Sequence, residues 1–79
     1  MAIQLLLAAT LRSYLAGYDP LQGRRLEVPR GTSVRQLIQR LGLPEDEVKL
    51  VMVNGIVTKL DAVLEGDERV ALFPPVGGG

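Results

Sequence analysis

The chain has 79 residues, with nine basic residues balancing nine acidic ones, and it contains neither cysteine nor histidine. A chain of this length forms one small domain with a single core, and its balanced charge offers nucleic acid or an anionic membrane no general electrostatic attraction. The missing residue types exclude disulfides, cysteine metal sites and a thiol nucleophile, and they remove the commonest general base. We therefore expect a protein with no catalytic side chains of its own.

The first apolar stretch, AIQLLLAATL, bears on the cellular location. It is too short to span a bilayer, which takes about 20 residues, and it lacks the basic start and cleavage pattern of a signal peptide. We expect a soluble, cytoplasmic protein that binds no membrane.

The first part of the chain predicts two strands that form a hairpin. Residues 3–9 suit a strand with one apolar set on the core face, namely Ile3, Leu5, Leu7 and Ala9. A turn of helix in TLRSYLAG ends at Gly17, and a loop leads to a short strand, RLEVP, with Leu26 and Val28 on one face.

The pattern changes to a helical period after Gly31. Four apolar residues then recur at positions i, i+3, i+4 and i+7: Val34, Leu37, Ile38 and Leu41. Ser33 and Gln36 have the spacing of a capping box, and Gly42 supplies a stop. This segment predicts one amphipathic helix.

Three more strands complete the predicted fold. Two apolar runs flank Asn54-Gly55, a pair that favours a type I′ hairpin turn, and residues 65–67 form another turn. RVALFPPV is a final strand closed by Pro74 and Pro75. Asp67 and Glu68 are expected to be turn and surface residues, because neighbouring carboxylates in a strand point to opposite faces and form no acid–base pair.

The element order is strand, strand, helix, strand, short strand, strand. The helix can bury its single apolar stripe only by lying across one face of the sheet, which makes an α+β two-layer domain. The β-grasp, or ubiquitin-like roll, has this order, so we expect a mixed sheet of four to five strands with one main helix packed across one face. The domain should cover residues 1–76 and leave a flexible glycine tail at residues 77–79.

The strands also predict an apolar face directed away from the helix. If Val70, Leu72, Val51 and Val53 point inward, their neighbours Ala71, Phe73, Leu50 and Met52 point outward. Leu6 joins them if the strands neighbour each other as in the β-grasp. Such a face is a candidate docking patch with Phe73 as its anchor. The alternative is that these residues are partly covered by loops or scattered singly over the surface.

The whole chain resembles the ubiquitin-like sulfur carriers of bacteria and archaea, and most closely the small subunit of molybdopterin synthase. IQLLLAATLRSYLAG resembles that family's first strand and following turn, TSVRQLIQRLGL its helix, and VMVNG its third strand. The most specific match is the ending, LEGDERVALFPPVGGG.

The resemblance implies that the reactive group is the carboxylate of Gly79. An adenylating, ubiquitin-activating-like enzyme would use ATP to activate this carboxylate, and a sulfur donor would convert it to a thiocarboxylate. The large subunit of molybdopterin synthase would then receive the sulfur for a pterin precursor, and the chain itself would bind no cofactor and no metal.

The physical chemistry of the tail agrees with this role. Gly77 and Gly78 have no Cβ to obstruct a narrow channel, and Pro74 and Pro75 stiffen the exit. Three extended residues reach roughly 10 Å, enough to thread the carboxylate into a partner's buried site. An α-carboxyl group with a pKa of about 3.5 is ionised at pH 7 and needs a leaving group before it can donate its acyl carbon.

Two alternatives remain open at this point. The same tail chemistry serves other acceptors: thiamine, cysteine, thiolated tRNA, or a target lysine as in ubiquitin-like modification. The second alternative is a β-grasp binding module with an inert tail, because small terminal residues are commonly just disordered.

Overall fold

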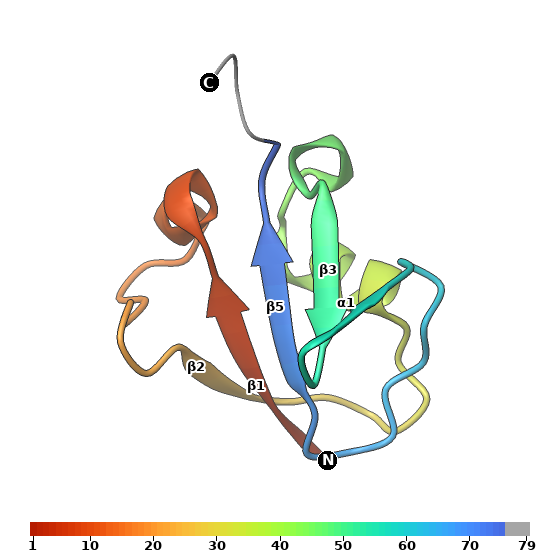
Figure 1. Cartoon of the computed structure of the whole chain (residues 1–79). Helices are drawn as coiled ribbons and strands as arrows, with labels where there is room; N and C mark the ends of the chain where they lie inside the picture. The colour runs from red at the N-terminus through yellow and green to blue at the C-terminus, as the bar shows by residue number, and fades with distance from the viewer. Residues whose placement is uncertain (76–79) are drawn as a thin grey trace.

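The computed structural model describes residues 1–75, so the domain boundary expected at residue 76 and the tail at 77–79 lie outside the described residues. Figure 1 shows a twisted sheet with one α-helix behind it. The elements in chain order are β1 (Ala2–Leu7), the 3₁₀ helix η1 (Ala9–Tyr14), β2 (Arg24–Glu27), α1 (Val34–Leu41), the 3₁₀ helix η2 (Glu45–Glu47), β3 (Leu50–Val53), β4 (Ile56–Thr58) and β5 (Arg69–Phe73).

The five strands form one mixed sheet in the order β2-β1-β5-β3-β4. The last strand, β5, occupies the centre, where it pairs parallel to β1 and antiparallel to β3 (Figure 1). The β1–β2 hairpin expected from the sequence is present, because the two strands pair antiparallel from Ala2↔Glu27 to Leu5↔Arg24. The expected β-grasp fold is therefore confirmed.

The core lies between the sheet and α1. The apolar stripe of the helix is buried in one cluster with the inward residues of the central strands: Val34, Leu37, Ile38, Leu5, Leu7, Val51, Val70 and Leu72. Both inward residues of β5 have no exposed surface. Removing this apolar surface from water is the main force that holds the helix on the sheet.

Local signals place the helix ends where the sequence predicted them. The hydroxyl of Ser33 accepts a hydrogen bond from the backbone N–H of Gln36 at 3.1 Å, and the Gln36 side chain accepts one from Ser33 N at 2.9 Å. Gly42 has a φ of 74° and donates its N–H to the carbonyls of Ile38 and Gln39. The capping box and the glycine stop are confirmed.

The turn between β3 and β4 has the predicted type I′ geometry. Asn54 and Gly55 have φ angles of 52° and 79°, and this turn requires positive values at both positions. Asn54 also accepts a hydrogen bond from the backbone N–H of Arg69 at 2.9 Å through its side-chain oxygen. The turn is thereby tied to the start of the central strand.

The first strand is shorter than expected. It ends at Leu7, and the predicted inward residue Ala9 is exposed, has a φ of 49° and begins η1. The alternation of apolar residues continues through Ala9, but β2 pairs with β1 only as far as Leu5. The strand therefore loses one of its two neighbours before Ala9, and the chain turns away.

The prediction that Glu68 is a surface residue is wrong, because the structure shows that it is buried. Burial opposes the charged form, but the backbone N–H groups of Glu65 and Gly66 donate hydrogen bonds of 2.6 and 2.7 Å to the carboxylate. Together with the nearby charge of Arg30, these bonds outweigh desolvation and hold the pKa of Glu68 below its ordinary value of 4.5. The carboxylate closes the turn that leads into β5.

We expect Glu68→Gln to lower the free energy of unfolding at pH 7 by about 1.5–3 kcal/mol, because a charged acceptor is lost. The folded pKa lies below 4.5, so the unfolded chain binds more protons just below that pH. This stabilisation is complete above the ordinary pKa and is lost as the pH falls through the folded pKa.

Urea unfolding over a pH series measures the difference in the free energy of unfolding between the wild type and Glu68→Gln. It should shrink in acid, and a difference that stays constant throughout would contradict the assignment. Asp67→Asn is the matched control, because the neighbouring Asp67 is exposed and its φ of 62° suits asparagine.

Candidate tail-exit site and docking face

The candidate site begins where the chain leaves the centre of the sheet. The carbonyl of Leu72 accepts a hydrogen bond from Ala8 N at 3.1 Å, and the carbonyl of Phe73 accepts one from Lys49 N at 2.8 Å. Pro74 and Pro75 follow, and since proline has no N–H the strand pairing cannot continue. The backbone is thus held on both sides up to Phe73 and is then released from the sheet.

Two short helical segments flank this exit. Figure 1 shows η1 on one side of the end of β5 and η2 on the other, at the edge of the sheet opposite the N-terminus. The exit proline Pro74 is half-buried and Pro75 is exposed. Gly77 and Gly78, predicted to thread into a partner, and Gly79, whose carboxylate the resemblance implies to be the reactive group, lie outside the described residues.

The predicted docking residues come together on the sheet face directed away from α1. Strand register sets Leu6 beside Ala71 and Ala71 beside Met52, and it sets Leu50 beside Phe73. Paired residues point to the same side of a sheet, opposite to their buried neighbours. These five residues are partly exposed, with Leu50 at 36%. We call this apolar surface, together with Val57, the outer sheet face.

Val57 is a member of this face that sequence reasoning missed. It pairs with Met52 across the β3–β4 hairpin and is 62% exposed. The signal was available, because the type I′ turn at residues 54 and 55 sets the register of the hairpin and therefore the partner of Met52. With Val57 the apolar row runs across β1, β5, β3 and β4.

Tyr18 and Arg12 hold the end of β1 beside the exit, and nothing in the sequence pattern pointed to this role. The backbone N–H of Leu7 donates to the Tyr18 hydroxyl at 2.6 Å, and the Nε of Arg12 donates to the Leu7 carbonyl at 3.0 Å. Strand β2 no longer pairs with β1 at this point. The two side chains therefore satisfy backbone groups that a neighbouring strand would otherwise bind.

A small pocket of ≈ 200 Å³ lies between the side chains of Tyr18 and Arg12 and the point where the chain leaves β5. Its walls include residues from the end of β1 and the start of η1, from the loop before β2 and from β5, among them Leu6, Ala8, Tyr18, Pro20, Ala71 and Phe73. The pocket is mainly apolar and adjoins the outer sheet face. It offers a recess for an apolar group of a partner, close to the point where the tail leaves.

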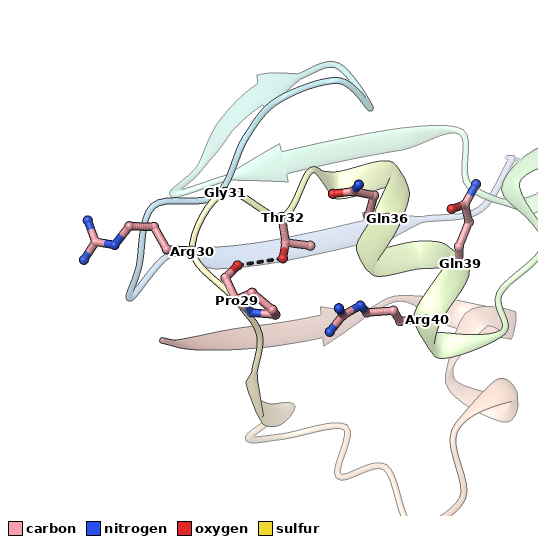
Figure 2. A pocket seen from close by; sticks show the side chains of 7 residues that line it. All are labelled: Pro29, Arg30, Gly31, Thr32, Gln36, Gln39 and Arg40. Carbon is pink, nitrogen blue, oxygen red and sulfur yellow. Dashed lines mark hydrogen bonds between the residues drawn. The ribbon is translucent and has the colours of Figure 1, made fainter.

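A larger pocket of ≈ 520 Å³ lies elsewhere, between residues 29–32 and the side of α1 (Figure 2). Arg30 and Arg40 line it together with amide side chains of the helix, and the hydroxyl of Thr32 donates to the Pro29 carbonyl at 2.6 Å. Figure 2 shows Arg30 pointing away from the helix. The lining contains no pair of groups suited to nucleophilic or acid–base chemistry.

Two further searches cover residues 1–75. In this part of the chain, no group of three or more His, Cys, Asp or Glu side chains is placed to hold a metal ion. None of the helices described is long and apolar enough to cross a membrane.

Comparisons of the sequence and the fold with known proteins identify the family of this chain. The model of the ThiS family matches residues 7–79. The protein RnfH of Cereibacter sphaeroides is 37% identical over 59 residues, which cover 67% of this chain and 69% of RnfH. The crystal structure of SAMP1 from Haloferax volcanii has a TM-score of 0.73 at 22% identity and covers all of both chains, which supports the fold.

A third similar protein is the putative molybdopterin converting factor, subunit 1, from Pyrococcus furiosus. Its structure has a TM-score of 0.70 at 26% identity, and the match covers 95% of this chain and 98% of that one. The family match extends over most of the sequence, from Leu7 at the end of β1 through the glycine ending. The chain therefore belongs to the ThiS family of ubiquitin-like sulfur carriers.

Proposed function

We propose that this sulfur carrier holds sulfur as a thiocarboxylate at Gly79 and donates it in molybdopterin biosynthesis, as the small subunit of molybdopterin synthase in the cytoplasm. The observation that carries the proposal is the exit from β5. The central strand is bonded on both sides up to Phe73 and is released at Pro74, next to an apolar docking face. The similarity of 95% of the chain to a putative molybdopterin converting factor subunit supports the choice of pathway.

The chemistry at the terminus follows from the properties of a backbone carboxylate. At pH 7 the α-carboxylate is ionised, so an oxygen can attack the α-phosphorus of ATP in the activating enzyme and expel pyrophosphate. The resulting acyl adenylate has AMP as its leaving group. A sulfur nucleophile at the oxidation level of sulfide then attacks the acyl carbon, AMP departs, and the thiocarboxylate remains.

The rest of the chain binds the partner proteins and positions the tail. The adenylating enzyme and the large synthase subunit would dock on the outer sheet face, where Phe73 lies nearest the exit and Leu50, Met52, Ala71 and Leu6 extend the apolar contact. Pro74 and Pro75 would aim the tail, and Gly77 and Gly78 would pass through a channel too narrow for side chains. The two partners would bind this face one after the other, because each of them must take up the same tail.

Intact mass measurement tests the proposal. The chain is incubated with ATP, the host's activating enzyme and sulfide, and a variant lacking Gly78 and Gly79 is treated in parallel. We expect a mass gain equal to the replacement of one oxygen by sulfur in the full chain and none in the truncated one. No gain, when the enzyme does activate a known carrier, would favour a binding module with an inert tail.

A second step tests the acceptor. The thiocarboxylated chain is mixed with the large subunit of molybdopterin synthase and the pterin precursor, and loss of the sulfur mass is followed together with product formation. Sulfur transfer to the pterin is the expected result. A thiocarboxylate that forms but does not react here would move the assignment to another acceptor, such as thiamine, cysteine, tRNA or a protein lysine.

A further inference from the structure

Two arginines border the apolar part of the outer sheet face. Arg25 on β2 pairs with Gln4 on β1, and Gln4 pairs in turn with Arg69 on β5. Paired residues point to the same side of a sheet, and Gln4 shares its side with Leu6, two positions further along β1. The register therefore places both arginine side chains on the outer sheet face, in the row next to that of Leu6 and Ala71.

Both guanidinium groups are free to meet a partner. Arg25 and Arg69 are exposed, and the two ion pairs found within residues 1–75 both belong to Arg35 instead. Among the residues of the five strands, the single carboxylate is that of Glu27, which pairs with Ala2. Glu27 lies one row further from the apolar residues than Arg25 does. The charge that borders the apolar surface is therefore positive.

A protein that binds at the tail exit is large enough to reach these arginines. Four steps along β5 separate Arg69 from Phe73, which is about 13 Å at the rise of a strand. An ordinary protein–protein interface buries about 800 Å² on each side, so a round contact is about 30 Å across. A contact centred on Ala71 therefore covers both the exit and the arginine row.

The electrostatics of activation favour the activating enzyme as the partner that needs this row. In the proposed function the terminal carboxylate approaches ATP on that enzyme, and both groups are negatively charged at pH 7. Like charges repel, so the tail opposes its own delivery. The chain has no net charge, so an attraction that offsets this repulsion has to come from a local patch. The two arginines supply such a patch on the surface that docks.

We infer that Arg25 and Arg69 form an ionic docking site for the activating enzyme, and that this enzyme carries two carboxylates roughly 10 Å apart beside its apolar contact surface, since two strand spacings separate the arginines. A guanidinium group binds a carboxylate through two parallel hydrogen bonds. Two such contacts, together with the apolar rows, fix the rotation of the chain on the enzyme. The inference rests on the proposed function and names a further contact of its first partner.

Association kinetics of the full chain with the activating enzyme, measured without ATP at low and at high salt, test this inference. A variant with both Arg25→Gln and Arg69→Gln should bind about three- to thirtyfold more weakly, mainly through slower association. Most of this loss should disappear at about 1 M salt, where the Debye length is only about 3 Å. Glu27→Gln should have the opposite effect and associate faster, because it removes the carboxylate nearest to Arg25.

Arg40→Gln is the matched control, because it removes the same charge from an exposed residue of α1, on the other side of the sheet. Its Kd should equal that of the wild type at both salt concentrations. An unchanged Kd for the double variant would overturn the ionic site, and so would a loss that stays undiminished at high salt. A loss seen only with the large subunit of molybdopterin synthase, titrated in parallel, would assign the arginines to that partner and also overturn the inference.

Failure of this inference and failure of the proposed function give different results. The sulfur mass gain of the wild-type chain tests whether Gly79 is activated, whatever surface the enzyme uses. A mass gain together with normal binding of the double variant would leave the function standing and make the arginines solvated surface charges. Salt-dependent binding without any mass gain would support the docking site and contradict the role of the tail.

Discussion

Ala71→Glu should weaken binding of the activating enzyme at least about a hundredfold while the domain remains folded. Ala71 lies on the central strand β5, paired with Leu6 on one side and Met52 on the other, in the middle of the outer sheet face. In the free protein the new carboxylate can reach water. In a closed apolar interface it would be buried without a partner, which costs several kcal/mol.

Titration calorimetry with the activating enzyme measures this loss, and thermal unfolding of the same sample shows whether the fold is kept. Gln39→Glu is the matched control, because it introduces the same charge on the exposed side of α1, away from the outer sheet face. An unchanged Kd for Ala71→Glu would show that partners do not dock on this face. The assignment of Phe73 as an anchor would then fail as well.

Leu72→Ala should lower the free energy of unfolding by about 2.7–5 kcal/mol, the range for removing a fully buried leucine and leaving a cavity. Leu72 has no exposed surface and lies on the strand that contacts both β1 and β3. At roughly 0.05–0.15 kcal/mol per residue, a domain of this size has a total stability of about 4–12 kcal/mol. The substitution therefore removes a large share of it.

Urea unfolding of the purified proteins checks this value. Leu21→Ala makes the same chemical change at a residue that is 91% exposed, so its effect should stay within about 0.5 kcal/mol. Similar losses at the two positions would mean that Leu72 does not occupy the core, and the central place of β5 would have to be reconsidered.

Features that depend on near neighbours along the chain could be predicted from the sequence. Ser33, Gln36 and Gly42 define the ends of α1 through bonds made within the helix, and Asn54-Gly55 sets its turn through two backbone angles. Strand alternation likewise separated the inward residues from those of the outer sheet face, because it is a property of each strand alone. The family resemblance added an expected role for the glycine ending.

The sequence could not predict which strands are neighbours or what each loop covers, because both depend on contacts between distant segments. The central position of β5, the partnership of Leu6 with Ala71 and the early end of β1 depend on pairing between distant segments. Glu68 is buried because a turn folds its backbone N–H groups onto the carboxylate, and residue 23 must be glycine because a Cβ there would clash with the Leu5 carbonyl oxygen. These contacts join residues whose local patterns carry no information about each other, so they appear only when the chain has folded.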